Sequence, residues 1–204
     1  FKWNEGRIGI GTTNAKSGSL SRNIHTSGFV VGADKRRGDD VMHGYAFQFG
    51  TENIDIIPSR SGIFAKTYSL SMYGTKLIES HYFTNAILGI SHIDLDTKRE
   101  EKNNILAGTR NGNQIYGTIN LGKRINTDNY NFSPNIKFDL GYTRLDEYEE
   151  ENEFGTRTDA LLFKKHEIVT GLGTVSLLLD KTIQHYEDRI INHTGRFEYI
   201  IDFS

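Results

Sequence analysis

Hydrophobic and polar residues alternate with a period of two along most of the chain. The clearest run covers residues 132–142, where apolar side chains alternate with Asn135, Lys137 and Asp139. This period is typical of a β-strand with one apolar and one polar face. Similar runs cover residues 41–50, 68–73, 82–91, 115–122 and 197–203, and weaker ones cover 4–12, 27–35 and 165–179. No sustained helical periodicity competes with them, so the pattern predicts an all-β chain with about nine strands.

The polar face of these runs carries full charges, and the apolar face is long and rich in aromatic residues. This arrangement favours a transmembrane antiparallel up-and-down β-barrel, whose outside meets lipid and whose lumen is polar. Each run is near the ~9–11 residues that a tilted membrane strand needs. The residues expected to face lipid are Tyr45, Phe47, Phe49, Leu70, Leu88, Ile136, Phe138, Leu140, Tyr199 and Ile201. The residues expected to line the lumen are Glu5, Arg7, Asp34, Gln48, Asn85, Asn120, Arg124, Lys137, Asp139, Glu198 and Asp202.

The expected connections between strands alternate in length. Long connections are expected over residues 13–26, 51–66, 94–112 and 144–164, and shorter ones over 36–40, 76–80 and 123–130, while 180–194 departs from the trend. Outer-membrane barrels place long loops at the cell surface and short turns in the periplasm, so the alternation predicts an orientation. The acidic run 146–153 is expected to be a solvated loop.

Composition agrees with this fold class. The chain has 21 Gly, 2 Pro and no Cys, and only 36% of its residues are hydrophobic. A low apolar content suits a barrel with a polar lumen, and scarce proline suits long ladders. Net charge is −2 with no basic stripe, which argues against nucleic acid as a partner. No apolar run reaches the ~18 residues of a transmembrane helix, and any export signal is expected upstream of Phe1.

Candidate chemistry is sparse. The histidines are scattered without metal-ligand spacing, so neither a metal nor another cofactor is expected. Ser91, His92 and Asp94 could suggest a barrel enzyme, but neighbouring residues of a strand face opposite sides, so no enzyme is expected. Glycines beside inward aromatic residues such as Tyr73 and Tyr116 are expected to let those rings lie flat on the sheet.

Several segments, in their order along the chain, resemble the β-domain of autotransporters, the type V secretion proteins. The resemblance is carried by Trp3 with its Gly-spaced strand, by SGFVVGADK at 27–35, by YSLSMYG at 68–74, by PNIKFDLGY at 134–142 and by EYIIDF at 198–203. It implies a translocator in the bacterial outer membrane: a twelve-stranded barrel whose linker helix threads the pore and whose upstream passenger reaches the cell surface.

The resemblance also implies which parts and partners to expect. Single-chain bacterial barrels have even strand numbers, so about three C-terminal strands are expected outside residues 1–204, as are the linker helix and the passenger. An eight- or ten-stranded barrel is the alternative count. Expected partners are outer-membrane lipid, the protein's own passenger and linker, and barrel-assembly machinery, with the barrel itself monomeric. Two other functions stay open: a small structural or adhesive outer-membrane barrel with ligand-binding loops, and a soluble ligand-binding β-barrel.

Overall fold

A computed structural model describes residues 1–15, 20–79, 81–102, 104–127, 130–152, 160–185 and 189–203. Nine long strands are β1 Lys2–Thr13, β2 Ser21–Arg37, β3 Val41–Ile57, β4 Gly62–Ile78, β5 Tyr82–Glu101, β6 Asn104–Lys123, β8 Asn131–Leu145, β12 His166–His185 and β13 Arg189–Asp202. Four two-residue strands are β7 Ile125–Asn126, β9 Tyr148–Glu149, β10 Glu151–Asn152 and β11 Leu162–Phe163. No helix in these ranges is long and apolar enough to cross a membrane.

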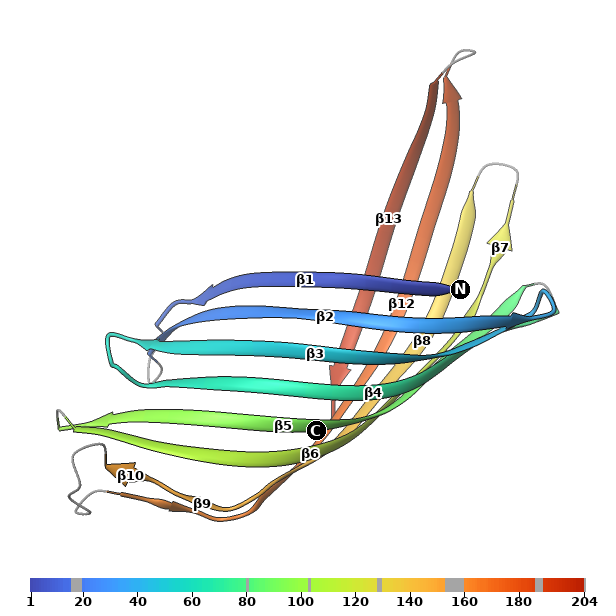
Figure 1. Cartoon of the computed structure of the whole chain (residues 1–204). Coiled ribbons are helices and arrows are strands. Elements are labelled where there is room, and N and C mark those ends of the chain that lie inside the picture. Colours follow the sequence, from blue (N-terminus) through green and yellow to red (C-terminus); the bar gives the residue numbers. More distant parts are fainter. Residues whose placement is uncertain are drawn as a thin grey trace.

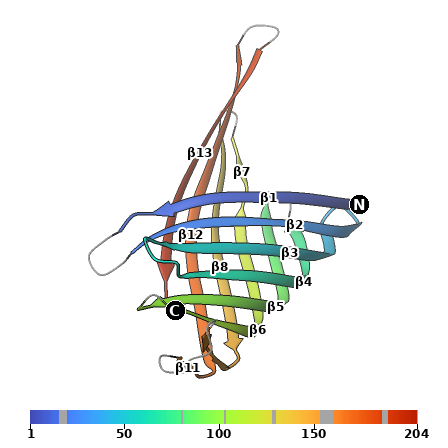
Figure 2. The ribbon, with the colours of Figure 1, turned by 60° about the vertical axis from the view of Figure 1, so that its left-hand side comes forward.

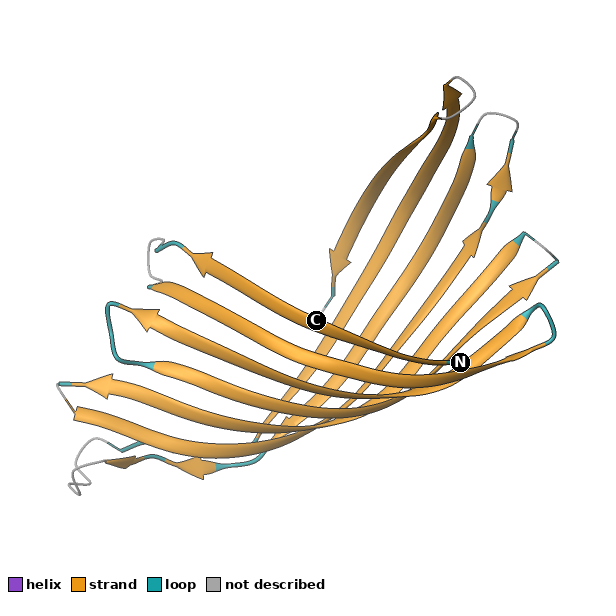
Figure 3. Ribbon diagram, turned by 45° about the horizontal axis from the view of Figure 1, so that its top comes forward, coloured by secondary structure: helices purple, strands orange, loops and turns teal. Residues whose placement is uncertain are grey.

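The nine long strands form one antiparallel sheet in the order β1-β2-β3-β4-β5-β6-β8-β12-β13. Neighbours in sequence are therefore neighbours in space, as in an up-and-down barrel. The sheet curls so that β12 and β13 cross behind β1 and β2 (Figures 1 and 2), and Figure 3 shows the strands that carry the two termini at separate edges of the sheet. Within the described ranges no backbone ladder joins β1 to β13, and the sheet is open between these two edges. Each of the nine alternating runs predicted from the sequence overlaps one long strand, and most strands extend beyond their run.

The predicted long loops are largely wrong. Pairing between β3 and β4 continues from Thr51↔Lys66 to Asp55↔Gly62, and pairing between β5 and β6 continues from Asp94↔Asn111 to Glu101↔Asn104. The two ends of the sheet therefore differ in how far the strands stay paired beyond the predicted runs. We call the end that holds Phe1 and the β2–β3 turn the N-terminal rim, and the opposite end the extended rim (Figure 1).

The apolar side chains change face within the extended strands. On β5, Leu88 and Ile90 lie on one face, but Ile93 and Leu95 lie on the other, because successive side chains of a strand alternate. Leu106 on β6, which is 1% exposed, belongs to the second group. The alternation continues through the predicted loops with its phase shifted by one residue. Because the apolar residues move to the other face, a pattern with one apolar face predicts strands that are shorter than those in the structure.

Candidate functional site

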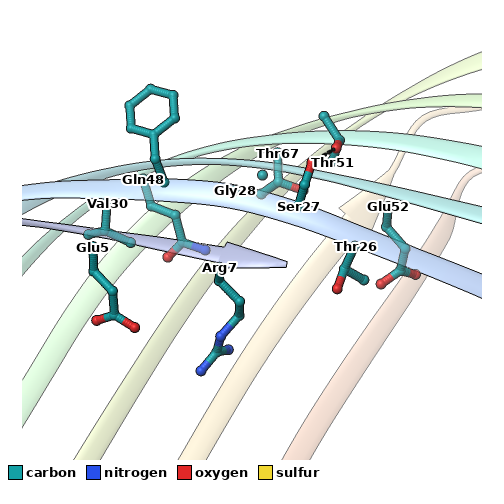
Figure 4. Close-up of a pocket in the computed structure, with 12 residues that line it drawn as sticks. Glu5, Arg7, Thr26, Ser27, Gly28, Val30, Gln48, Thr51, Glu52 and Thr67 are labelled. Atoms are coloured by element: carbon teal, nitrogen blue, oxygen red, sulfur yellow. Dashed lines mark hydrogen bonds between the residues drawn. The ribbon is translucent and has the colours of Figure 1, made fainter. Parts of the chain in front are cut away.

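The cross-strand register assigns every strand residue to one of two faces. Glu5 pairs with Val30, Val30 pairs with Gln48, and Gln48 pairs with Ser69, so these four side chains share a face. This is the concave face of the curled sheet: Glu5, Arg7 and Gln48 point to the side on which the later strands pass (Figure 4). Small buried side chains all lie on this face, where neighbours converge: Ala46, Ser69, Ser91, Thr143, Thr174 and Ser176. We call it the inward face.

Ten of the eleven residues predicted to line a lumen are strand residues on the inward face. They are Glu5, Arg7, Asp34, Gln48, Asn85, Asn120, Lys137, Asp139, Glu198 and Asp202. The eleventh, Arg124, follows the end of β6, and its guanidinium lies 5.6 Å from the ring centre of Phe83. Phe83 pairs with Gly122 on the inward face, so Arg124 lies at the N-terminal rim of the same surface. The register therefore brings these residues, which come from seven of the nine long strands or their ends, onto one surface.

The ten residues predicted to face lipid lie together on the opposite, outward face. The exposed fraction is 62% for Tyr45, 55% for Leu70, 55% for Leu88, 58% for Leu140 and 69% for Tyr199. Phe47, Ile136, Phe138 and Ile201 are also exposed, and Phe49 is half-buried between Phe29 and Tyr68. A contiguous exposed apolar surface of this extent needs another apolar phase to cover it.

A chain of aromatic and acidic groups crosses the inward face near the N-terminal rim. Trp3 Nε1 on β1 donates to the Tyr73 hydroxyl on β4 over 2.8 Å, and Tyr73 donates to Asp34 Oδ2 on β2 over 3.2 Å. The two rings meet across two intervening strands because glycines lie beneath them. A Cβ on Gly32 would lie 2.4 Å from the Trp3 ring, and one on Gly44 would lie 2.6 Å from the Tyr73 ring.

The same device recurs in the middle of the sheet. A Cβ on Gly89 would lie 2.3 Å from the Tyr116 ring, so Tyr116 also lies flat over a glycine. The expectation that glycines permit flat inward rings at Tyr73 and Tyr116 is therefore confirmed. Flat rings keep bulky side chains near the wall and leave the space above the inward face open.

Two pairs of oppositely charged side chains lie on the inward face. Lys137 Nζ lies 2.8 Å from Asp139 Oδ2, and Thr118 Oγ1 donates to Asp139 Oδ1 over 2.7 Å. Arg196 and Glu198 on β13 form a second pair at 2.6 Å. Asn120 Oδ1 is buried with no hydrogen-bond partner among the described residues. The surface thus carries charged groups of both signs together with uncharged polar groups.

The prediction of a solvated loop over residues 146–153 is wrong for Glu150, while Glu153 lies outside the described residues. The Glu150 side chain is 2% exposed, Arg99 Nη2 lies 2.6 Å from Oε2, and Arg99 Nε donates to Oε1 over 3.0 Å. The Leu161 amide also donates to this carboxylate, over 3.1 Å. The hydrogen bond from Arg99 lowers the pKa of Glu150 below its ordinary value.

Tyr148, within the same acidic run, stacks on Phe163 with ring centres 4.7 Å apart. These contacts fasten the β8–β12 connection to the extended rim. A run of acidic residues is typical of a solvated loop. Arg99, the basic partner of Glu150, lies 51 residues away in the sequence, so the local sequence gives no sign of this ion pair.

Of the three residues that could suggest a barrel enzyme, Ser91 lies on the other face of the sheet from His92 and Asp94. Ser91 lies on the inward face, where its hydroxyl is 2.8 Å from that of Ser69. His92 lies on the outward face, with Nε2 3.0 Å from Asp94 Oδ1 and Nδ1 3.1 Å from Asn113 Oδ1. Among the described residues no cluster of three or more His, Asp or Glu side chains could hold a metal ion.

Comparisons with known proteins agree with this architecture. The family model "Autotransporter beta-domain" matches residues 3–204. Surface cell antigen sca2 of Rickettsia felis is 26% identical over 152 residues, which are 74% of this chain but 9% of that protein. The translocator domain of NalP from Neisseria meningitidis is similar in structure with a TM-score of 0.75, at 12% identity, over 100% of this chain and 66% of that one. The β-domain of the Bordetella autotransporter BrkA has a TM-score of 0.72, at 12% identity, over 99% of this chain and 78% of that one.

Proposed function

The chain belongs to the autotransporter β-domain family, and from that premise we propose that it anchors a longer protein in the bacterial outer membrane and provides the pore through which that protein exports its own passenger. The family match spans residues 3–204 and favours this function over a small adhesive barrel or a soluble ligand-binding barrel. Members of the family are outer-membrane β-barrels, which fits the exposed apolar outward face.

The observation that carries the proposal is the separation of polar and apolar residues between the two faces. An exported segment must pass through a hydrated channel, since no water is available for its backbone in the hydrocarbon layer. The inward face offers carboxylates, amides and cations held near the wall, and the eleven lumen candidates named above are its proposed lining. We propose no catalysis for this surface and no cofactor.

We propose further that more strands close the barrel. The edges of β1 and β13 are unpaired among the described residues, and the chain covers 66% of the NalP translocator domain. The ninth long strand, β13, runs from the N-terminal rim toward the extended rim. An even number of strands returns the chain to its starting side, and about twelve are proposed here. The linker helix, the passenger and barrel-assembly machinery are the proposed partners, and the closed barrel is proposed to be a monomer.

The orientation follows from the same proposal. The extended rim carries polar outward residues beyond the apolar band, such as Asp55, Asp94 and Asn111, and is suited to water outside the membrane. We place the extended rim at the cell surface and the N-terminal rim in the periplasm.

Deleting residues 82–123, which form β5 and β6, from the full-length protein tests the function. We expect the passenger to be accessible to added protease on intact cells in the wild type, and to be inaccessible in the deletion variant, because an interrupted sheet cannot form the pore. A passenger epitope detected in cell lysates of both strains controls for expression. Equal surface exposure of the passenger in the two strains would refute the translocator proposal.

A further inference from the structure

The outward face at the N-terminal rim carries charges of one sign only among the described strand residues. Alternation and register place six cationic side chains there, which we call the cation belt: Lys2, Lys35, Arg37, Lys76, Lys123 and Lys181. The acidic residues at this rim lie elsewhere. Asp34, Asp180 and Glu198 are on the inward face, and Asp39, Asp40 and Glu79 are in turns.

The belt residues on different strands lie at the height expected for a ring parallel to the membrane around the curved sheet. Through successive register pairs, Lys35 on β2 is level with Gly74 on β4, Ile119 on β6 and Gly173 on β12. The belt residues on these strands lie two, four and eight residues further toward the rim, while the strands are two, four and six places away in the sheet. Barrel strands tilt by about 35–45°, which shifts a level ring by roughly 1 to 1.5 residues per strand. Lys35, Lys76, Lys123 and Lys181 therefore lie at one level around the sheet, and Arg37 lies two residues beyond Lys35 on β2.

The belt residues keep their charges available. Among the described residues none of the six forms an ion pair, and Lys2, Lys35, Arg37 and Lys76 are exposed. Lys123 Nζ lies 5.0 Å from the ring centre of Tyr82, and Lys181 Nζ lies 4.8 Å from that of Tyr130. Aromatic rings at this level mark the boundary between hydrocarbon and headgroups in membrane barrels. The cations thus lie at headgroup depth, directly beyond the apolar band.

The extended rim offers a contrast on the same face. Its outward side chains carry charges of both signs, and two cations there pair with acidic neighbours: Arg60 with Glu100 at 2.8 Å, and Lys165 with Glu167 at 3.5 Å. A one-signed, unpaired ring is therefore a property of one rim only.

From this asymmetry we propose that the cation belt binds the phosphate groups of anionic phospholipids in the leaflet at the N-terminal rim, so that the barrel recruits a shell of anionic lipid there. The proposal rests on the membrane location given under Proposed function. Its physical basis is charge complementarity between unpaired ammonium and guanidinium groups and lipid phosphates at the same depth. The Tyr82 and Tyr130 rings hold the two half-buried lysines in place for this contact.

Spin-labelled lipids test the proposal with the full-length protein in phosphatidylcholine vesicles. The fraction of motionally restricted label gives the association of phosphatidylglycerol relative to phosphatidylcholine. We expect the wild type to prefer phosphatidylglycerol by about threefold to tenfold, less at high salt. The triple variant Lys35→Gln, Lys76→Gln and Lys123→Gln should lose most of this preference. The matched control removes three lysines near the other rim, Lys66→Gln, Lys98→Gln and Lys165→Gln, and should keep it.

A wild type without lipid preference, or a control variant that loses as much preference as the belt variant, would overturn the belt as an anionic lipid site. Flotation with the vesicles separates this failure from failure of the proposed function. Protein that floats but shows no preference contradicts the belt alone, whereas protein that never enters the vesicles contradicts the membrane barrel.

Discussion

Phe47→Arg is expected to prevent stable membrane insertion of the β-domain, whereas Gln48→Arg, at the next position of β3, is expected to be tolerated. Phe47 points outward in the middle of the apolar band, between Val31 and Leu70 on the neighbouring strands. An arginine on the lipid face near mid-depth costs about 2–4 kcal/mol, and loss of the aromatic side chain adds to that cost. Gln48 points inward, where added charge meets water and Glu5 is nearby.

The pair is matched because both substitutions introduce the same side chain into the same strand at the same depth. Folding of the full-length variants into phospholipid vesicles, followed by urea titration, gives the difference in the free energy of unfolding. We expect a loss of more than about 3 kcal/mol for Phe47→Arg and less than about 1 kcal/mol for Gln48→Arg. Equal losses would mean that the two faces do not differ in their surroundings.

Glu150→Gln is expected to loosen the β8–β12 connection while leaving the membrane part of the barrel intact. The substitution removes one charge of a pair whose carboxylate is buried and which also accepts the Leu161 amide. Breaking a fully buried pair costs about 3–5 kcal/mol, and because the Arg99 side chain is 29% exposed we expect about 2–3 kcal/mol. Hydrogen exchange of the β9–β11 amides measures the local opening.

Glu101→Gln is the matched control for this prediction. Glu101 contacts the same guanidinium at 3.2 Å, but its side chain is 41% exposed, so its loss should cost about 0–1 kcal/mol. If both variants open the connection equally, burial of Glu150 does not determine its stability.

The same pair predicts a dependence on pH. Because the pKa of Glu150 is lower in the folded state than in the unfolded chain, its contribution is fully present above the unfolded value of about 4.3 and is lost as the pH falls through the folded value. Opening of the β9–β11 segment should therefore increase in the wild type below about pH 4, and change much less in Glu150→Gln. An identical pH profile in the two proteins would contradict this assignment.

The membrane-crossing parts of the strands were predictable from sequence because one physical rule governs them. Between residues 132 and 142 each side chain meets either an apolar or a polar phase, and the alternation has a single phase throughout. The same rule predicts that the lumen candidates share one face, and the cross-strand register places Gln48 and Asp139 on the same face.

The extended rim was not predictable in this way because water surrounds its outward side. Ile93 and Leu95 turn inward there, so the rule reverses inside one strand without a turn residue to mark the change. Glu150 depends on Arg99, a partner brought close only by the fold. The pairing partners of the edge strands β1 and β13 also could not be predicted from the local sequence, because they depend on how the whole sheet closes.

Cysteine accessibility along β3 tests the central claim most directly. Residues 1–204 contain no cysteine, so single cysteines at positions 44 to 50 in the full-length protein report each position separately within this domain. In cells, a water-soluble maleimide should label position 48, which is inward and exposed, and leave 45, 47 and 49 unlabelled, while a lipid-soluble maleimide should show the opposite pattern. Uniform labelling of all positions by the water-soluble reagent would contradict a barrel with a hydrated lumen and a lipid-facing exterior.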